Sequence, residues 1–489
     1  MRYRSTKHAQ IPQVRSIVCA AVILAIGGCA NYRDIDSKAE LRKPESFATQ
    51  ETFDVAASDW PTQQWWLQFN DAQLNALIDE AIAHNPSLDI AAARVRSAQA
   101  YTGVAHSANY PDIDATGTIS YQKFSENWIF PPPWGGSSFF NSTLHLNAAY
   151  ELDFWGKNRA GVKVAVSQER AAQAEQQSAV LLLTSNVTKI YIELDRLFAE
   201  HDVMAQTLQE REKVFTLTQQ RFDAGIDNRG DVKQAESQLP VLRGQLAQID
   251  EAIGATRNAL AALLGQGPDR GLQIKRPHLA IAQTEIKLPA NLPVNLLGRR
   301  PDVVAARWQA EAAQQQVNVA KAQFYPNVSL TGYVGFSSLG LDNLTKASSL
   351  ESGIGPAIQL PIFAGGRLRY NLKNQYANYD IAVANYNATL TTALRDVADQ
   401  LNALQSLQKR QIEQKSAAAI AHSALNFSTQ RYEAGLGNYL SVLNAEMLVL
   451  AQEQLGIELN ARARNIQIDL IKALGGGYDA TQKTAALPN

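Results

Sequence analysis

The sequence predicts a mainly α-helical chain with a small β part of membrane-length strands, built from two copies of one unit. Three observations support this fold class: motifs that recur at a fixed interval, four segments of alternating polarity, and two long helical stretches without proline. Each copy is expected to run as strand, loop, strand, long helix, turn and returning helix. A further helix leads into the first strand of each copy.

The internal duplication appears in motifs that return 210 to 215 residues later. Tyr110-Pro111 returns as Tyr325-Pro326, and Arg221-Phe222-Asp223-Ala224-Gly225 returns as Arg431-Tyr432-Glu433-Ala434-Gly435. This interval exceeds the repeat of about 20 to 50 residues that is typical of solenoids, so two similar halves packed side by side are expected. Further pairs in the same order are Asn85-Pro86 with Arg300-Pro301, Phe154-Trp155-Gly156 with Phe363-Ala364-Gly365, Gln234-Ala235-Glu236 with Asn444-Ala445-Glu446, and Leu264-Gly265 with Leu474-Gly475.

Residues 1–28 have the pattern of a secretory signal peptide. Basic residues precede an apolar run from Ile17 to Ile26, and Gly27-Gly28-Cys29 follows. The small residues before Cys29 resemble a bacterial lipobox, which implies cleavage there and attachment of lipid to Cys29, and Ala30 after it suggests sorting to the outer membrane. Residues 29–64 would form a lipidated tail. The alternative is an ordinary secretory signal in which the cysteine is coincidental.

Composition narrows the remaining possibilities. The chain is 46% hydrophobic, has a formal net charge of −1 and contains no basic domain, so nucleic acid is not an expected partner. The other cysteine, Cys19, lies within the signal, so no internal disulfide is expected. No apolar run of about 18 residues follows the signal, so any membrane crossing must use β-strands.

Four segments alternate between apolar and polar residues over about ten positions, as transmembrane strands do. The same alternation would also fit a soluble sheet packed on one face. Four strands cannot close a barrel, so a spanning chain must oligomerise: two copies give eight strands and three give twelve. The apolar positions are Ile113, Ala115, Gly117, Ile119 and Tyr121; Leu144, Leu146, Ala148, Tyr150, Leu152 and Phe154; Val328, Leu330, Gly332, Val334 and Phe336; and Ile354, Pro356, Ile358, Leu360 and Ile362.

Long helices are expected after the second strand of each copy. The stretches from Gly156 to Gly225 and from Gly366 to Tyr432 contain no proline, and apolar residues recur in them at steps of three and four, as in a heptad seam. About 65 helical residues make a rod of roughly 100 Å. The seam residues are Val180, Leu183, Val187, Ile190, Leu194 and Leu197 in the first copy, and Leu390, Leu394, Val397, Leu401 and Leu404 in the second.

Each long helix is expected to end at a glycine turn, because a glycine just past a helix end can adopt the left-handed conformation. The turns lie at Gly225 and Gly435, and returning helices run to about Leu264 and Leu474. The leading helices cover about Asp71 to His106 and Pro301 to Gln323.

Taken together, these motifs resemble the outer-membrane efflux factors of the TolC and OprM type, most closely the NodT-like outer-membrane lipoproteins. The resemblance runs from about Trp60 to Leu474 and rests on the order and duplication of its motifs. They are Trp65-Trp66, Phe69, Asp71, Leu74, Leu77-Ile78, Asn85-Pro86, Ala108-Asn109-Tyr110-Pro111, Leu152-Asp153-Phe154-Trp155-Gly156, Arg299-Arg300-Pro301-Asp302, Phe324-Tyr325-Pro326, Phe363-Ala364-Gly365-Gly366 and Arg431-Tyr432-Glu433-Ala434-Gly435.

The resemblance implies a homotrimer with a 12-stranded barrel in the outer membrane, continued by a 12-helix tunnel through the periplasm. It divides the chain into a first repeat (65–264), an equatorial connection (265–299), a second repeat (300–474) and a C-terminal tail (475–489). Such channels conduct small molecules passively and contribute to multidrug resistance. They work with a periplasmic adaptor, or membrane fusion protein, and an inner-membrane pump, usually of the RND class.

The resemblance also places a periplasmic aperture just after the second glycine turn. Its residues would be Leu440, Ser441 and Asn444, with Arg431 and Tyr432 latching neighbouring helices, and the turns at Gly225 and Gly435 would receive the adaptor. Ser441 and Asn444 stand where relatives commonly carry aspartate, so no charged ring is expected from them. Asp231, with Asp227 and Arg229 nearby, could supply that charge or be a solvated turn residue. Leu440 could narrow the pore or pack between helices.

The sequence shows no signature of catalysis: no nucleophile elbow, no paired carboxylates and no histidines at metal-ligand spacing, so neither an enzyme nor a cofactor or metal is expected. Two alternatives stay open. A conduit for polypeptides of the type I secretion kind uses the same architecture. A lipid-anchored periplasmic coiled-coil adaptor without a pore would carry one helical hairpin, whereas this sequence predicts two.

Overall fold

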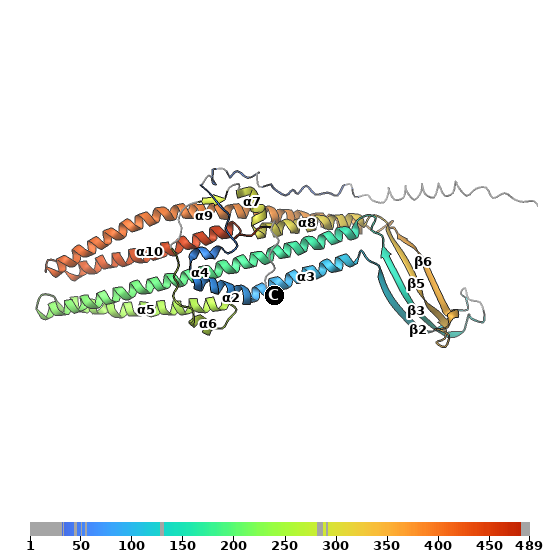
Figure 1. The fold of residues 1–489 in the computed structure, drawn as a ribbon, viewed down its shortest axis with the longest axis horizontal. Helices are drawn as coiled ribbons and strands as arrows, with labels where there is room; N and C mark the ends of the chain where they lie inside the picture. The colour runs from blue at the N-terminus through green and yellow to red at the C-terminus, as the bar shows by residue number, and fades with distance from the viewer. Residues whose placement is uncertain are drawn as a thin grey trace, which may run out of the picture. The chain divides into compact units, whose positions relative to one another are not determined.

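The computed structural model describes residues 32, 34–43, 46–49, 51–53, 56–127, 132–280, 287–289 and 292–480. The predicted signal peptide and Cys29 lie outside these residues. The chain divides into two compact units, which are taken in turn below and whose elements are labelled in Figure 1. Unit 1 comprises Met1–Leu41, Arg96–Ala171 and Arg307–Asn385, and unit 2 comprises Arg42–Val95, Ala172–Ala306 and Tyr386–Asn489.

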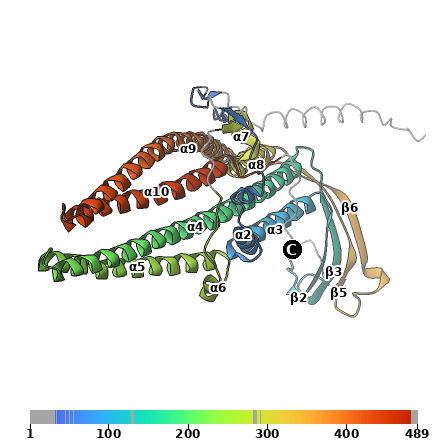
Figure 2. The same cartoon turned by 60° about the vertical axis from the view of Figure 1, so that its left-hand side comes forward.

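Unit 1 contains a four-stranded antiparallel sheet in the order β2-β3-β5-β6, seen in Figures 1 and 2. The sheet joins the two copies, because β3 of the first pairs with β5 of the second. A short 3-10 helix, η3 (Ala347–Ser349), precedes the last strand. The strands are β2 (Asp112–Lys123), β3 (Ser138–Glu151), β5 (Asn327–Leu339) and β6 (Leu350–Gln359).

The register places the alternating residues on two faces as the sequence predicts. One row runs from Ala115 through Leu146 and Val334 to Ser352 and belongs to the apolar face. Most of the large residues of this face are exposed in the single chain, since nothing in the described residues covers them. They include Ile113, Ile119, Leu144, Leu146, Val334, Ile354 and Ile358.

The opposite face is polar and carries a contact that spans three strands. His145 on β3 lies opposite Gly335 on β5, which lies opposite Glu351 on β6. The imidazole Nε2 of His145 lies 2.6 Å from the Glu351 carboxylate. A side chain on Gly335 would overlap the backbone of the neighbouring strand, so glycine at the central position lets the two outer strands meet.

Two predicted strand boundaries were wrong. β3 ends at Glu151, so Leu152 and Phe154 follow the strand, and β6 ends at Gln359, so Leu360 and Ile362 lie beyond it. Both errors fall at the strand-to-helix connections, where apolar residues continue beyond the end of the strand, although the Leu152 amide still donates to the Val328 carbonyl at 2.8 Å. Pro356 is tolerated because β6 is an edge strand of this sheet.

The beginning of the described chain packs within unit 1. Ile35 is buried among apolar residues of α8 (Pro301–Ala322) and α9 (Arg367–Glu433), and the Tyr32 hydroxyl lies 3.2 Å from that of Tyr325. Arg369 on α9 donates to the Asp34 carboxylate at 2.5 Å. Tyr32 and Ile35 therefore lie close to Tyr325 and Phe324, which precede β5.

Unit 2 is formed mainly by two helical hairpins. The first joins α4 (Lys157–Asp223) to α5 (Arg229–Leu263), and the second joins α9 to α10 (Tyr439–Ala473), as Figure 2 shows. Both long helices have 67 residues and both returning helices have 35, which is the duplication in structural form. The helix α5 continues through Pro240 and ends at Leu263, as the predicted returning helix to about Leu264 requires.

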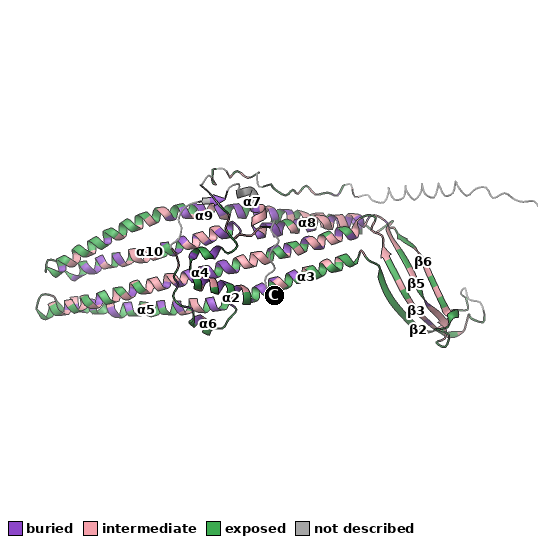
Figure 3. Cartoon of the chain, viewed as in Figure 1, coloured by how far each residue is buried: buried purple, intermediate pink, exposed green. Residues whose placement is uncertain are grey.

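The predicted heptad seams form much of the core of unit 2, and Figure 3 shows their buried residues alternating with exposed ones along the helices. All five seam residues of the second copy are buried. In the first copy Leu183, Val187, Leu194 and Leu197 are buried, while Val180 and Ile190 are partly exposed. The three-and-four spacing therefore located the packed face of both long helices.

The remaining anchor motifs meet one another in space. The Asn85 side chain donates to the Leu263 carbonyl at 2.8 Å, and Arg300 donates to the Ala473 carbonyl at 3.4 Å in the equivalent place. Each contact ties the segment before a proline to the end of a returning helix. Asn85 also divides the first predicted leading helix into α2 (Ala72–His84) and α3 (Pro86–Ser107), because the residue before a proline disfavours helical geometry.

Smaller elements complete unit 2. They include η2 (Trp65–Phe69), α6 (Pro268–Leu272) and α7 (Leu292–Arg299), and β1 (Ala56–Ser58) pairs in parallel with β4 (Lys287–Pro289). Asp71 caps α2 and accepts hydrogen bonds from the Tyr191 hydroxyl at 2.9 Å and the His278 amide at 2.8 Å. Within the described residues, no helix combines the length and the apolar character needed to cross a bilayer.

Candidate aperture at the hairpin turns

Both hairpins turn with the same backbone geometry. Gly225 and Gly435 have φ of 75° and 74°, which a residue with a Cβ rarely adopts. The amide of Ile226 donates to the Arg221 carbonyl at 2.8 Å, and Leu436 donates to the Arg431 carbonyl at the same distance. These bonds close the ends of α4 and α9 in the manner of a Schellman motif.

Each returning helix starts at an asparagine cap. Asn228 accepts from the Asp231 amide at 3.1 Å, and Asn438 accepts from the Ser441 amide at 3.1 Å. In the first turn the Asp231 carboxylate also accepts from the Asn228 amide at 3.3 Å, which completes a capping box. The Asp231 carboxylate therefore stabilises the start of α5.

The residues expected to line the aperture lie on the first turns of α10. Leu440 is 48% exposed, and Ser441 and Asn444 are also exposed, whereas Tyr439, Val442 and Leu443 between them are buried. Leu440 does not pack into the hairpin, which leaves it available to contact another surface. Whether these three residues narrow a pore stays a prediction.

Tyr432 joins the two hairpins. Its side chain is 1% exposed, and its hydroxyl lies 2.8 Å from the Asp227 carboxylate and 3.0 Å from the Thr218 hydroxyl. Arg221 stacks over the Tyr432 ring at 4.4 Å, donates to the Tyr432 carbonyl at 3.1 Å and pairs with Asp227 at 2.9 Å. The other latch candidate, Arg431, is exposed and donates weakly to the Leu436 carbonyl at 3.4 Å.

This cluster changes the acidity of its members. Burial raises the pKa of the Asp227 carboxyl, but hydrogen bonds from Arg221 and Tyr432 outweigh burial and hold the pKa below its usual range. The hydrogen bond to Asp227 raises the pKa of Arg221, and burial raises the pKa of Tyr432. At neutral pH the cluster therefore consists of an ionised carboxylate, a guanidinium and a neutral phenol.

A second tie lies further along the hairpins from the turns. Arg211 on α4 lies 2.9 Å from the Glu446 carboxylate on α10, and both side chains are almost fully buried. Arg211 also donates to the Tyr439 hydroxyl at 3.4 Å. Burial raises the pKa of Glu446 despite its cationic partner. Near the turns, the two hairpins are thus joined by two polar contacts separated by apolar packing. Further from the turns, the ion pairs Lys189–Asp469 and Asp195–Arg464 also join α4 to α10.

Sequence reasoning assigned no contact between the hairpins to Arg221, Thr218, Arg211 or Glu446, although Arg221 and Glu446 belong to repeated motifs. Arg221 belongs to the repeated motif, and the loss of Asp227 in the second copy, where Gly437 stands, was a usable signal of special function. Arg211 carried no signal, because a lone arginine in a long helix is usually solvated. Within the described part of the chain, no cluster of three or more His, Cys, Asp and Glu side chains could hold a metal ion.

A solved outer membrane protein shares this arrangement of paired strands and long helical hairpins. A solved structure with this fold is the outer membrane protein VceC of Vibrio cholerae, which is 41% identical, has a TM-score of 0.81 and covers 86% of this chain and 100% of its own. The family model for outer membrane efflux proteins matches residues 77–266 and 292–476. The chain belongs to the outer membrane efflux protein family.

Curated relatives agree with this assignment. The multidrug resistance outer membrane protein MdtP of Shigella flexneri is 31% identical over 93% of this chain and 94% of its own length. The fusaric acid resistance protein FusA of Burkholderia cepacia is 36% identical over 73% of this chain and 68% of its own. The protein is therefore an outer-membrane protein of a family whose members are channels rather than enzymes. The adaptor alternative falls, because both hairpins are present and the chain matches the channel family.

Proposed function

We propose that the protein is the outer-membrane channel of a tripartite efflux system, conducting small molecules passively through a gated homotrimeric tunnel. An inner-membrane pump, of the RND class, supplies the energy, and a periplasmic adaptor docks at the turns around Gly225 and Gly435. The names of MdtP and FusA, which refer to multidrug and fusaric acid resistance, favour small toxic molecules as cargo.

The observation that carries the proposal is the exposed apolar face of the sheet in unit 1. Ile354 is 81% exposed, and Ile358 on the same face of β6 is also exposed. Such a face is stable when it contacts lipid. The outer edges of β2 and β6 have no partner strand within the described residues, and open edges cannot face hydrocarbon. Three copies supply twelve strands, which close a barrel, and twelve hairpin helices, two long and two returning from each copy, which form the tunnel.

The proposed gate lies at the turns. The Tyr432 cluster holds the two hairpins of one subunit together, while Leu440, Ser441 and Asn444 face away from the hairpin and meet the equivalent residues of two further copies. Separation of the hairpins would draw these residues apart. The Asp231 carboxylate caps α5 and keeps its negative charge, whereas Ser441 and Asn444 at the second turn are neutral.

The proposed anchor is lipid on Cys29, after removal of residues 1–28. The packing of Tyr32 and Ile35 near the start of β5 supports it, because these residues lie only a few positions after Cys29 in the chain. The domain division proposed from the sequence, with repeats at 65–264 and 300–474 around an equatorial connection at 265–299, is kept as part of this proposal.

The test is single-channel recording of the purified protein in a planar bilayer, with its mass in detergent measured in parallel. A trimer with small resting openings is expected, and replacing Leu440, Ser441 and Asn444 together by alanine should raise the resting conductance several-fold. Ser416→Ala, an exposed change in the middle of α9, is the matched control and should leave it unchanged. A monomer that never conducts, with or without the triple change, would refute the channel proposal.

The role of the lipid is tested separately. Cys29→Ala, expressed with a functional signal, is expected to form the same trimer with the same conductance, because lipid on Cys29 tethers the chain without contributing to the tunnel wall. A variant that stays monomeric would show that the tether is needed for assembly.

A further inference from the structure

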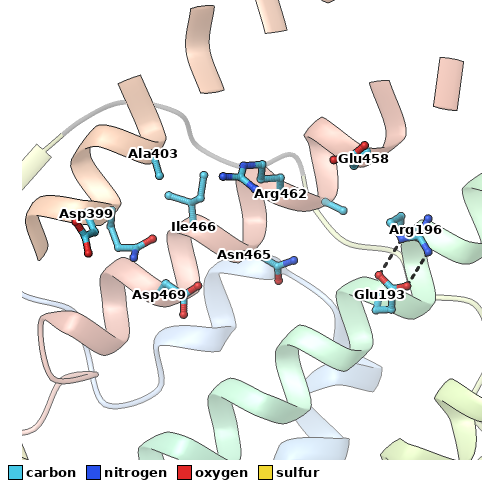
Figure 4. Close-up of a pocket in the computed structure, with 11 residues that line it drawn as sticks. Glu193, Arg196, Asp399, Ala403, Glu458, Arg462, Asn465, Ile466 and Asp469 are labelled. Carbon is cyan, nitrogen blue, oxygen red and sulfur yellow. Dashed lines mark hydrogen bonds and ion pairs between the residues drawn. The ribbon is translucent and has the colours of Figure 1, made fainter. Parts of the chain in front are cut away.

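An open groove of about 540 Å³ lies within unit 2, at a distance from both turns along the helices. Figure 4 shows it: α4 lies on one side, α9 on the other, and α10 forms the floor between them. Ala403, Ala461 and Ile466 contribute apolar surface. Six charged residues line the groove: Glu193, Arg196, Asp399, Glu458, Arg462 and Asp469.

Most of these charges are already paired. Arg196 binds the Glu193 carboxylate at 2.7 Å and that of Glu200 at 2.7 Å, and Asp469 pairs with Lys189 at 2.5 Å. Asp399 has a distant partner in Arg395 at 3.8 Å. Within the described residues, only Arg462 and Glu458 among the six have neither an ion pair nor a hydrogen bond. The side-chain oxygen of Asn465, which also lines the groove, is buried without a hydrogen bond among these residues.

The groove opens on the side of α10 opposite to residues 273–280. Arg464 donates to the carbonyls of Ala280 at 3.3 Å and Leu279 at 3.4 Å, in a strap formed by residues 273–280, and pairs with Asp195 at 2.8 Å. Residues two apart on a helix point about 200° apart, so Arg462 faces away from the strap. The same spacing separates Glu193 from Asp195 on α4.

This arrangement fixes the side of the wall on which the groove lies, given the proposed trimeric tunnel. A closed ring of helices has room for an additional layer of chain only on its outside, so the strap is external. The groove is also the concave side of three neighbouring helices, which is the side that a ring turns toward its axis. Three symmetric copies would then place three unpaired arginines around the lumen.

We propose that the groove is a binding site on the tunnel wall for solutes that carry a carboxylate, and that Arg462 binds that carboxylate. A guanidinium without a partner binds a carboxylate through two parallel hydrogen bonds, and the nearby alanine and isoleucine side chains favour an apolar body beside that carboxylate. Glu458, one helical turn before Arg462, opposes such binding because it repels the anion and competes for the guanidinium. The inference rests on the proposed channel function and adds a class of cargo to it.

Accessibility is tested first. The sequence holds cysteines only at positions 19 and 29, so Arg462→Cys introduces a thiol that a charged methanethiosulfonate reagent can find during bilayer recording. Current is expected to fall in three steps, one for each subunit. Lys275→Cys, on the exposed strap, is the matched control and should leave the current unchanged. Loss of current in the control alone would place the groove outside the lumen and overturn the proposal.

Recognition is tested with benzoate as the probe, by measuring the concentration that halves the current. This concentration is expected to rise about tenfold in Arg462→Gln, the effect of losing one charge-assisted contact, and to fall several-fold in Glu458→Gln. Lys275→Gln should match the wild type, and block by benzylamine should not weaken in Arg462→Gln. Equal benzoate block in all variants would refute the proposed carboxylate-binding site, while the proposal of a conducting trimer would stand. A protein with no current at all would instead refute the proposed function.

Discussion

The two hairpin turns share a backbone but not a chemistry. Both end in a glycine with the same φ and restart at an asparagine cap, yet the residues around them have diverged. The first turn keeps Arg221 and Asp227, whereas its counterpart has the exposed Arg431 and Gly437. The second turn has the buried Tyr432 where the first has Phe222, which is 37% exposed. Duplication thus gave two equivalent scaffolds, and divergence made them complementary.

The comparison has a mechanical consequence. If both turns carried a tyrosine, or both carried an arginine and an aspartate, this contact between the two hairpins could not form. Because the carboxylate and guanidinium come from one hairpin and the phenol from the other, the cluster exists only when the hairpins are side by side. The same division recurs at the second tie, where Arg211 of the first copy has the small residue Ala421 as its counterpart.

The largest expected effect comes from removing the buried ring. Tyr432→Ala deletes a fully buried aromatic and three polar contacts, and should lower the local free energy of opening by about 4 kcal/mol. Phe222→Ala, at the equivalent position of the first copy, should cost less than about 1 kcal/mol because its ring is partly in solvent. Amide hydrogen exchange of the segment following each site measures both. Equal losses would mean that the turns are interchangeable.

The second tie should respond almost as strongly. Arg211→Met keeps much of the side-chain volume but leaves the Glu446 carboxylate buried without its cation, at a cost of about 3 kcal/mol near pH 7. Burial already raises the pKa of Glu446 above its usual value of 4.5, so the folded protein binds that proton more tightly than the unfolded chain does. The variant should therefore recover stability as the pH falls through the raised pKa toward 4.5. Hydrogen exchange at two pH values tests this, and a loss that is equal at both would contradict it.

The Tyr432 cluster, formed with Arg221 and Asp227, should have the opposite pH dependence. Because the pKa of Asp227 lies below its usual value of 3.8, its contribution is complete above about pH 4 and is lost as the pH falls through the lowered pKa. The resting conductance in a bilayer should rise over this acidic range. Asp227→Asn should show a raised conductance already at pH 7 and respond less to acid. Asp223→Asn, an exposed change at the end of α4 just before the turn, serves as the control and should behave like the wild type.

Much of this architecture could be predicted from the sequence, because the determining signals are periodic. The three-and-four spacing of Leu390, Leu394 and Val397 located a buried face, and the two-residue alternation around Leu146 located a strand. The repeat interval then paired one hairpin with the other. These signals depend on residues close together in the chain, which a single sequence displays directly.

The contacts between the hairpins could not be predicted in the same way. Arg211 and Glu446 lie far apart in the chain, and neither has a local pattern that distinguishes a buried ion pair from two solvated charges. Asp231 illustrates the same limit: the sequence allowed either a charge facing a pore or a solvated turn residue, and the structure adds a role in capping α5 that no pattern had suggested. Only the three-dimensional structure shows which of two chemically reasonable roles a polar side chain fills.

The smallest expected effect compares the two caps, and it separates local from shared stability. Replacing Asn228 by alanine removes one side of a reciprocal capping box, while the same change at Asn438 removes bonds to the amide and hydroxyl of Ser441. Each should cost about 1 kcal/mol, measured as faster exchange in the first turn of its own returning helix. Ser237→Ala, exposed and two turns further along α5, is the control and should change exchange very little.

Because a cap acts within a single helix, the loss at Asn228 should leave the first turn of α10 unaffected. If it were transmitted to α10, the turns would be coupled through more than the Tyr432 cluster, and the complementary contacts described above would not be the sole connection at the tips.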